Sequence, residues 1–355
     1  MMQLEQPKSL KLGFYPYTYV RTAVMKSMLF KREDYQKMLK MSFSEIAKVL
    51  QESSYKNEIN SLAADYSGAD LLELALIRSL AGSFKKLMMI SPQELSLIIR
   101  QYAKRKDIED IKTILRGKFT RFDENVMKRS ITGAGTLSYE FLMSLVKKES
   151  VEDILKNNKL VDFSYFDEAL KDMREKNSLA AVENILDRHY YGQLIKFSKI
   201  LPKEGALFRS FISKEVEILN ILTLLRLKRA GFSKGDINKF IIHPHQLGGS
   251  RIKSLANLEG LDEIAKSLEG TEYEDAVAIG IEEFKKNGSL IMLETRLYKH
   301  LLKQSILLLH QHPLSVNVIL GYMFAKDIEV RNLKIIIKGK QLGLEEQFIE
   351  SQLVY

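Results

Sequence analysis

The stretch Lys112–Lys118 reads KTILRGK, and it returns as LTLLRLK at Leu222–Lys228 and as KIIIKGK at Lys334–Lys340. The copies are separated by 110 and then 112 residues, and a looser copy lies at Lys26–Lys31. In the three close copies, counting the residue before each, apolar residues are spaced i, i+3 and i+4, which places them on one face of a helix. Recurrence at one fixed spacing indicates a chain built from repeated units.

Two further segments recur at nearly the same spacing. Glu45–Tyr55 matches Glu263–Tyr273, with a weaker middle copy that begins at Asp153. The second is a long helical segment, in which Glu73, Leu76 and Arg78 match Glu183, Leu186 and Arg188, and then Glu294, Leu297 and Lys299. Three separate segments with one common shift are hard to produce by chance, so we predict a threefold internal repeat.

The predicted units are residues 12–105, 106–215 and 216–324, followed by a partial fourth copy at 325–355 that holds the opening helix alone. The first unit is shortened, and its deficit falls between Lys31 and Ser44. Such units must dock on one another to bury their apolar faces, either as an open solenoid or closed around an axis. We expect the fourth opening helix to close onto the first unit. The three units would then surround a pseudo-threefold axis.

The chain is predicted to be all-α. Helical periodicity is sustained over residues 70–90, 178–200 and 288–310, which are longer than any ordinary strand. Ser42 with Glu45 forms a capping-box pattern, and Ser91 with Glu94 forms another, with Pro92 at the expected first helical position. Alternation of apolar and polar residues is nowhere sustained over six positions.

Composition removes several classes of protein. The 355 residues are 45% hydrophobic and 28% charged, which is typical of a globular chain and disfavours disorder. Cys is absent, which excludes disulfides, Cys-ligated zinc, iron–sulfur clusters and thiol nucleophiles. No secretory signal or uninterrupted apolar run of spanning length is present, so we expect a cytoplasmic protein that can also lie at a membrane surface, without bilayer insertion.

The sequence proposes no catalytic site. No Walker A pattern occurs, and Gly133–Thr136 (GAGT) is too short for a dinucleotide fingerprint and is typical of a loop. The close His pairs are His243 with His245 and His310 with His312, and neither has helical i, i+4 ligand spacing. We therefore expect no catalytic residues, no cofactor and no metal ion, and the roles of the two His pairs stay open.

The basic residues are more informative. The net charge is +9, and residues 100–129 hold ten Lys and Arg against five Asp and Glu. Residues 214–253, the corresponding part of the next unit, hold eight against three. Such segments are either solvated helix faces or a surface for an acidic partner or phosphate groups. Tyr102, Phe119 and Phe122 are the aromatic residues of the first segment, too few for the stacking platforms of single-stranded nucleic-acid binding.

The order of these features resembles a known family. The N-terminal Tyr15–Arg21 (YPYTYVR) leads into Val24–Leu29, and Glu45–Tyr55, Tyr66–Leu71 and KTILRGK follow. Together with the three helical repeats, they make the chain similar, nearly from end to end, to the C subunit of the archaeal and vacuolar-type (A/V-type) rotary ATP synthases. Its eukaryotic counterpart is the d subunit of the V-type ATPase.

The resemblance implies a non-catalytic central-stalk component. Family members form a funnel-shaped socket that couples the rotating shaft of the soluble head to the membrane ring that carries protons or sodium ions. The expected partners are the central-shaft subunits and the rotor-ring subunits, with one copy per complex at the cytoplasmic face of the membrane and no nucleic acid. The repeated cations are the predicted partner-binding residues: Lys112, Arg116, Lys118, Arg226, Lys228, Lys338 and Lys340.

Other interpretations stay open. The same cations could solvate helix faces or cap helix ends. A helical-repeat adaptor or RNA-binding scaffold would use the repeated basic surfaces, and it would bind nucleic acid with a steep salt dependence. An enzyme would need titratable groups that converge in a pocket, and no such set is visible in the sequence. The sequence does not distinguish proton from sodium coupling, or synthesis from hydrolysis of ATP.

Overall fold

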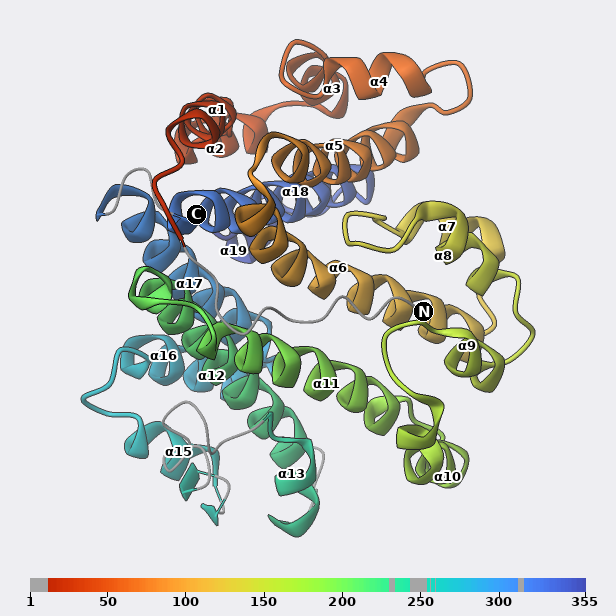
Figure 1. Ribbon diagram of the computed structural model, residues 1–355, viewed down its shortest axis with the longest axis vertical. Coiled ribbons are helices and arrows are strands. Elements are labelled where there is room, and N and C mark those ends of the chain that lie inside the picture. The colour runs from red at the N-terminus through yellow and green to blue at the C-terminus, as the bar shows by residue number, and fades with distance from the viewer. Residues whose placement is uncertain (1–11, 230–233, 243–253, 256, 259, 312–315) are drawn as a thin grey trace.

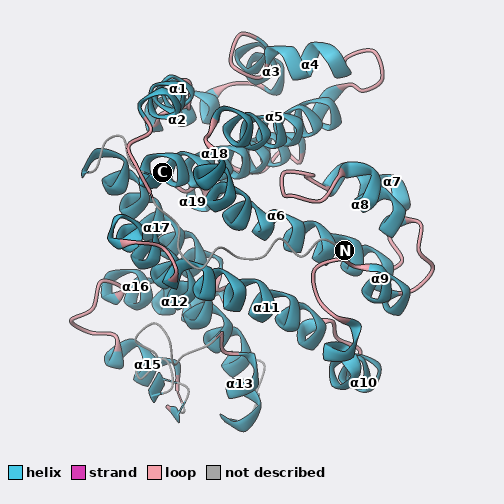
Figure 2. Cartoon of the chain, viewed as in Figure 1, coloured by secondary structure: helices cyan, strands magenta, loops and turns pink. Residues whose placement is uncertain are grey.

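The computed structural model describes residues 12–229, 234–242, 254–255, 257–258, 260–311 and 316–355. Throughout these residues the chain is helical, with loops and turns between helices and no strand (Figures 1 and 2). The all-α prediction is therefore confirmed for the described part of the chain.

Long helices form the interior, and short helices surround them (Figure 1). The long helices are α5 (Gly68–Ile90), α6 (Gln93–Phe119), α11 (Ala180–Lys199), α12 (Ala206–Arg229), α17 (Ile291–Gln311) and α18 (Val316–Gln341). The N-terminal short helices are α1 (Pro16–Ser27), α2 (Arg32–Lys40), α3 (Phe43–Gln51) and α4 (Lys56–Leu62). The middle ones are α7 (Glu124–Ser130), α8 (Tyr139–Val146), α9 (Val151–Asn157), η1 (Phe163–Phe166), α10 (Asp167–Lys176) and η2 (Lys203–Gly205). The last ones are α13 (Lys234–Phe240), α15 (Leu261–Ser267), α16 (Glu274–Asn287) and α19 (Glu346–Gln352).

The predicted helix starts are confirmed at one site and wrong at the other. Ser42 and Glu45 form the predicted capping box of α3, with reciprocal bonds between each side chain and the other residue's backbone N–H. At α6 the N-cap residue is Pro92, and no side chain caps the helix. The Ser91 hydroxyl is buried and has no hydrogen-bond partner among the described residues. Pro92 therefore occupies the position at which the sequence pattern placed Ser91.

The long helices contact one another in a closed cycle. Each helix packs against the next along the chain in the pairs α5 with α6, α11 with α12, and α17 with α18. The cycle continues through α6 with α11 and α12 with α17, and α18 returns to α5. Contacts of α18 with α6 and α12 lie inside this cycle. A single buried apolar cluster runs through all of these helices, so none of them stands apart as a separate core.

The C-terminal helices pack against the N-terminal ones. α18 contacts α1, α3 and α5, and α19 contacts α2. Residues 325–355 therefore lie against residues 15–100, which the expected closure of the chain requires. Among the helices within the described ranges, none combines the length and the apolar character needed to span a membrane.

Candidate functional site

Three charged residues from three different long helices meet in the interior. Arg105 of α6 donates from Nη1 to Glu215 of α12 at 3.0 Å and from Nη2 to Asp327 of α18 at 2.5 Å. Lys106 also contacts Asp327, at 2.6 Å. Arg105, Glu215 and Asp327 are separated by 110 and 112 residues, the same shifts that separate the copies of the KTILRGK segment. We call these three residues the charged triad.

Two members of the charged triad are buried, the third, Asp327, is partly buried, and the charges compensate one another. Arg105 and Glu215 are 6% and 5% exposed. Burial raises the pKa of Glu215, although Arg105 opposes this shift. Burial also acts against ionisation of Asp327, but the positive charges of Lys106 and Arg105 hold its pKa below the ordinary value. The guanidinium of Arg105 lies 4.6 Å from the ring centroid of Tyr102, which adds a cation–π contact.

A cavity of about 760 Å³ adjoins the charged triad. It extends toward the C-terminal ends of α6, α12 and α18, and side chains of α5, α11 and α17 complete its wall. Its charged lining includes Lys106, Lys112, Asp187, Arg226 and Arg331. The cavity is therefore bordered by all six long helices of the contact cycle, with the charged triad on its wall.

One hydrogen-bond pattern occurs three times around the cavity. In each case a side-chain oxygen on a long helix accepts a bond from the backbone N–H of the residue 22 positions later in the chain. The pairs are Thr132 with Asp110 at 2.7 Å, Ile242 with Asn220 at 2.8 Å and Val354 with Asn332 at 2.9 Å. The accepting residues are again 110 and 112 residues apart, so corresponding positions make the same contact.

The first of these contacts anchors the loop that contains Gly133–Thr136. Asp110 accepts the backbone N–H groups of Thr132 and Gly133 at 2.7 and 2.8 Å. Asp107 accepts the backbone N–H of Thr136 at 2.8 Å, and a Cβ added to Gly135 would overlap the Asp107 carboxylate. Burial, opposed by these hydrogen bonds, raises the pKa of Asp110 to about 6. The loop predicted from the sequence is present, and two buried carboxylates hold it.

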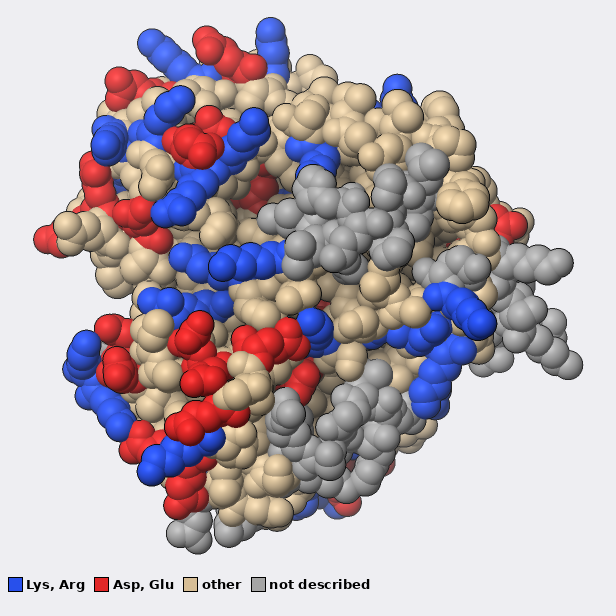
Figure 3. Space-filling view, turned by 90° about the vertical axis from the view of Figure 1, so that its left-hand side faces the viewer, with Lys and Arg blue, Asp and Glu red and all other residues tan. Residues whose placement is uncertain are grey.

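Each predicted partner-binding cation contacts another part of the chain. The ion pairs are Lys112 with Asp187, Arg116 with Glu183, Lys118 with Glu124, Arg226 with Glu294, Lys338 with Glu73 and Lys340 with Glu346, while Lys228 donates to the backbone carbonyl of Leu258. Figure 3 shows the same mixture on one face, where Lys and Arg stand beside Asp and Glu over its left half. Lys112 and Arg226 line the cavity. The other five lie outside its lining.

Three of these ion pairs correspond to one another. Each joins the C-terminal part of a long helix to a glutamate near the start of another, and the basic partners are 110 and 112 residues apart. They are Arg116 with Glu183 at 2.6 Å, Arg226 with Glu294, and Lys338 with Glu73 at 2.8 Å. In the third pair the basic residue belongs to α18 and the acid to α5, so this pair joins the last long helix to the first one.

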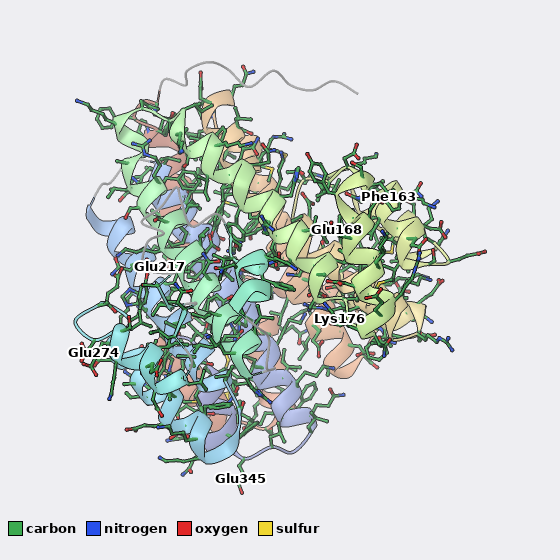
Figure 4. All side chains as sticks on the ribbon, turned by 90° about the horizontal axis from the view of Figure 1, so that it is seen from below. Phe163, Glu168, Lys176, Glu217, Glu274 and Glu345 are labelled. Carbon is green, nitrogen blue, oxygen red and sulfur yellow. The ribbon has the colours of Figure 1, made fainter. Side chains whose placement is uncertain are left out.

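A buried tyrosine makes a similar connection. The Tyr55 hydroxyl donates to Glu329 of α18 at 2.6 Å and accepts from Lys326 at 2.9 Å. Tyr273, which matches Tyr55 in the repeat, donates to Glu217 of α12 at 3.1 Å. Phe163 stands at the matching middle position and has no hydroxyl (Figure 4, which also labels Glu217). Tyr55 and Tyr273 thus make a contact that Phe163 cannot make.

The sequence analysis missed the charged triad. A signal was present, because aligning the copies at shifts of 110 and 112 places Arg105, Glu215 and Asp327 at one repeat position with opposite charges. His243, His245 and His312 lie outside the described residues, as does the side chain of His310. Within the part of the chain that the structure describes, His, Asp and Glu side chains form no group of three or more that could hold a metal ion.

Comparisons with known proteins agree along nearly the whole chain. The sequence model of the family described as ATP synthase (C/AC39) subunit matches residues 19–352. The chain is similar to the A-type ATP synthase C subunit of Methanococcoides burtonii, with 39% identity over 346 residues, 96% of this chain and 94% of that protein. It is also similar to the A-type ATP synthase C subunits of Methanosarcina acetivorans (37% identity, 96% and 92% covered) and Halobacterium salinarum (30%, 96% and 97%).

Proposed function

Because the chain belongs to the ATP synthase (C/AC39) subunit family, we propose that it is the non-catalytic central-stalk socket of an A/V-type ATP synthase. In this role it accepts the rotating shaft of the soluble head and joins it to the membrane rotor ring. The observation that carries the proposal is the cavity of about 760 Å³ at the centre of the long-helix cycle. A socket needs an opening bordered by the wall of the subunit, and the lining of this cavity by all six long helices supports such a role.

The proposal includes three repeated units around a pseudo-threefold axis. The charged triad supports this arrangement, because Arg105, Glu215 and Asp327 occupy one repeat position and contact one another. Side chains at the same position of three copies of the repeat can meet only if these copies face a common axis at that point. The threefold hydrogen-bond pattern and the threefold ion pair, both at shifts of 110 and 112, give independent support.

The proposal also assigns residues 325–355 to the completion of the first unit. In the third unit Tyr273 contacts Glu217, which lies on that unit's own long helix α12. In the first unit Tyr55 makes the corresponding contact with Glu329, which lies on α18. The Lys338–Glu73 ion pair likewise joins a residue of the first unit to α18. These contacts support a closed ring in which the last long helix takes the place that the shortened first unit leaves open.

Within this socket, the cavity-lining Lys112 and Arg226 are the best candidates for shaft contact among the seven predicted cations. The shaft subunits and the ring subunits are the proposed partners, and the proposed location is the cytoplasmic face of the membrane. Torque transfer requires rigidity and shape rather than chemistry, so the proposal includes no catalytic residue and no cofactor. The charged cavity wall favours a partner with complementary charges.

The test measures shaft binding by purified Arg226→Glu and Arg116→Glu variants at several salt concentrations. The two residues make corresponding ion pairs with Glu294 and Glu183, so both changes disturb folding similarly, but Arg226 lines the cavity and Arg116 does not. We expect Arg226→Glu to weaken binding about tenfold, or about 1.4 kcal/mol, and to reduce its salt dependence, with a smaller effect of Arg116→Glu. Equal effects of the two variants, or unchanged binding, would refute the socket assignment. Recovery of the chain from cells with nucleic acid rather than with the ATPase would favour the scaffold interpretation.

A further inference from the structure

A second cavity lies where the two ends of the described chain meet the third unit. Its volume is about 320 Å³, and its wall combines the start of α2, one face of α17, and α19 with Tyr355. Its cationic residues are Arg32, Arg296 and Lys299, and its carboxylate is Glu350. We call it the junction pocket. The side chains of its lining carry a formal excess of two positive charges, and the pocket is separate from the central cavity of the proposed socket.

In the described part of the chain, the three cations of the junction pocket lack acidic partners, since no ion pair there involves Arg32, Arg296 or Lys299. Instead Arg32 and Lys299 lie against the Tyr355 ring, 5.5 and 5.2 Å from its centroid. Glu350 does not neutralise them by a direct contact, because its oxygen accepts the Tyr355 hydroxyl at 2.8 Å. Every predicted partner-binding cation has an intramolecular partner, so this cluster differs from them.

Two buried hydrogen-bond donors of the pocket wall are also unused. The hydroxyl of Thr295, a residue that is 1% exposed, has no hydrogen-bond partner among the described residues, and neither has Nε of Arg296. A buried donor without a partner costs about 1–3 kcal/mol, so each such group calls for an explanation, and a bound ion that accepts the hydrogen bond is one. Both belong to α17 and lie beside Lys299, one turn further along the helix.

Besides burial, the crowding of the cations also lowers the pKa of Lys299. Burial lowers the pKa of Lys299, and the positive charges of Arg296 and Arg32 lower it further, although the negative charge of Glu350 opposes this shift. An anion in the pocket would remove this repulsion. Guanidinium groups bind phosphate oxygens in a bidentate manner, and the Thr295 hydroxyl and the Lys299 ammonium are suitable additional donors.

We propose that the junction pocket binds a phosphate group. The cations Arg296, Lys299 and Arg32 supply charge, and the unused donors supply directed hydrogen bonds. The phosphate can be free inorganic phosphate or the headgroup of an anionic lipid, since both present the same oxygens. Because the pocket joins α2, α17 and α19, a bound phosphate would tie the N-terminal helices to the third unit and the C-terminus. This inference does not depend on the socket function.

The test titrates the full-length chain with inorganic phosphate and follows binding by calorimetry and by the thermal midpoint. We expect a saturable rise of the midpoint that sodium chloride at equal ionic strength does not reproduce, since screening alone acts without saturation. Lys299→Gln and Arg296→Gln should each weaken phosphate binding about tenfold or more. Lys171→Gln is the matched control, because Lys171 is exposed on α10 and the change removes the same charge. No saturable phosphate binding, or equal affinity in Lys299→Gln and Lys171→Gln, would overturn the proposal.

A second arm identifies the source of the phosphate. Vesicles of phosphatidylcholine, with and without phosphatidic acid, are sedimented with the same variants. Binding to phosphatidic acid that Lys299→Gln abolishes and free phosphate inhibits would assign the pocket to a lipid headgroup. Phosphate binding without vesicle binding would assign it to the free anion. Vesicle binding that both Lys variants retain, together with no response to free phosphate, would count against the pocket.

Discussion

Replacing Arg105 by Met removes the guanidinium that contacts both Glu215 and Asp327. The resulting loss of stability depends on which contacts the two carboxylates keep. Asp327 keeps Lys106 at 2.6 Å, but Glu215 has no other ion pair among the described residues and is 5% exposed. Its second oxygen is already without a hydrogen-bond partner in that part of the chain. Leaving one charge of a buried pair uncompensated costs about 3–5 kcal/mol. We expect Arg105→Met to lower the free energy of unfolding by about this amount at neutral pH.

The pH dependence of this loss provides a second measurement. Burial already raises the pKa of Glu215 above 4.5 in the folded protein, and removing Arg105 takes away the charge that opposes the shift. A carboxyl with a raised folded pKa binds its proton more tightly in the folded state, so stability falls as the pH rises above the unfolded value. The deficit of Arg105→Met should therefore be larger at pH 8 than at about pH 5.

The assay is urea unfolding followed by far-UV circular dichroism, because the chain contains no Trp for fluorescence. The variant Arg105→Met/Glu215→Leu serves as the control, since it removes both charges and keeps the Asp327–Lys106 pair. We expect it to recover most of the lost stability, as buried ion pairs can often be replaced by apolar side chains. A loss below about 1 kcal/mol, a loss that does not change with pH, or a double variant no more stable than Arg105→Met would refute the reasoning.

Contacts in other places give three further predictions. Tyr55→Phe removes a hydrogen bond to the Glu329 carboxylate and should cost about 2 kcal/mol in urea unfolding. Asp110→Asn should remove a pH dependence: the raised pKa of about 6, against 3.8, makes wild-type stability fall by about 2 kcal/mol relative to the variant as the pH rises from 4 to 6, and by about 3 kcal/mol over the whole titration. Gly135→Ala should lower the thermal midpoint, with a cost of about 1–3 kcal/mol, because its Cβ would overlap a carboxylate. Gly82→Ala in α5, with open space around it, should instead stabilise the helix by about 0.5–1 kcal/mol.

Each of these predictions has a result that contradicts it. If Tyr55→Phe unfolds with the same free energy as the wild type, the hydrogen bond from Tyr55 to Glu329 contributes nothing to stability. Parallel stability curves of the wild type and Asp110→Asn between pH 4 and 6 would rule out a raised pKa at that carboxyl. Equal midpoints for the two glycine variants would show that the loop beside α6 has room for a side chain.

Helix positions could be predicted from the sequence because long amphipathic periods carry strong information. The predicted segments 70–90, 178–200 and 288–310 correspond to α5 (Gly68–Ile90), α11 (Ala180–Lys199) and α17 (Ile291–Gln311). Helix ends were less certain, as Ser91 shows, because Ser and Pro at neighbouring positions both fit a helix start. Local pattern alone does not decide which of them becomes the cap.

The candidate site was harder to predict for a different reason. Charge counts identified the segments that hold Lys112 and Arg226, which line the cavity. The counts could not show that Arg116 and Lys338 lie outside the cavity lining, because the position of a side chain relative to the cavity depends on how the long helices face one another. The charged triad and the junction pocket depend on residues that are more than 100 positions apart in the chain, and no local window contains both partners.

The contact between α18 and α5 has a consequence for synthesis on the ribosome. α5 ends at Ile90, while α18 ends at Gln341, so roughly 250 residues must be translated before the N-terminal helices receive their partner. At about 5–20 residues per second this takes on the order of 10–50 s. During that interval the apolar face of α5 that α18 will cover is exposed to solvent or held by a chaperone. A premature stop before α18 would thus leave the apolar face of α5, made much earlier, without its partner.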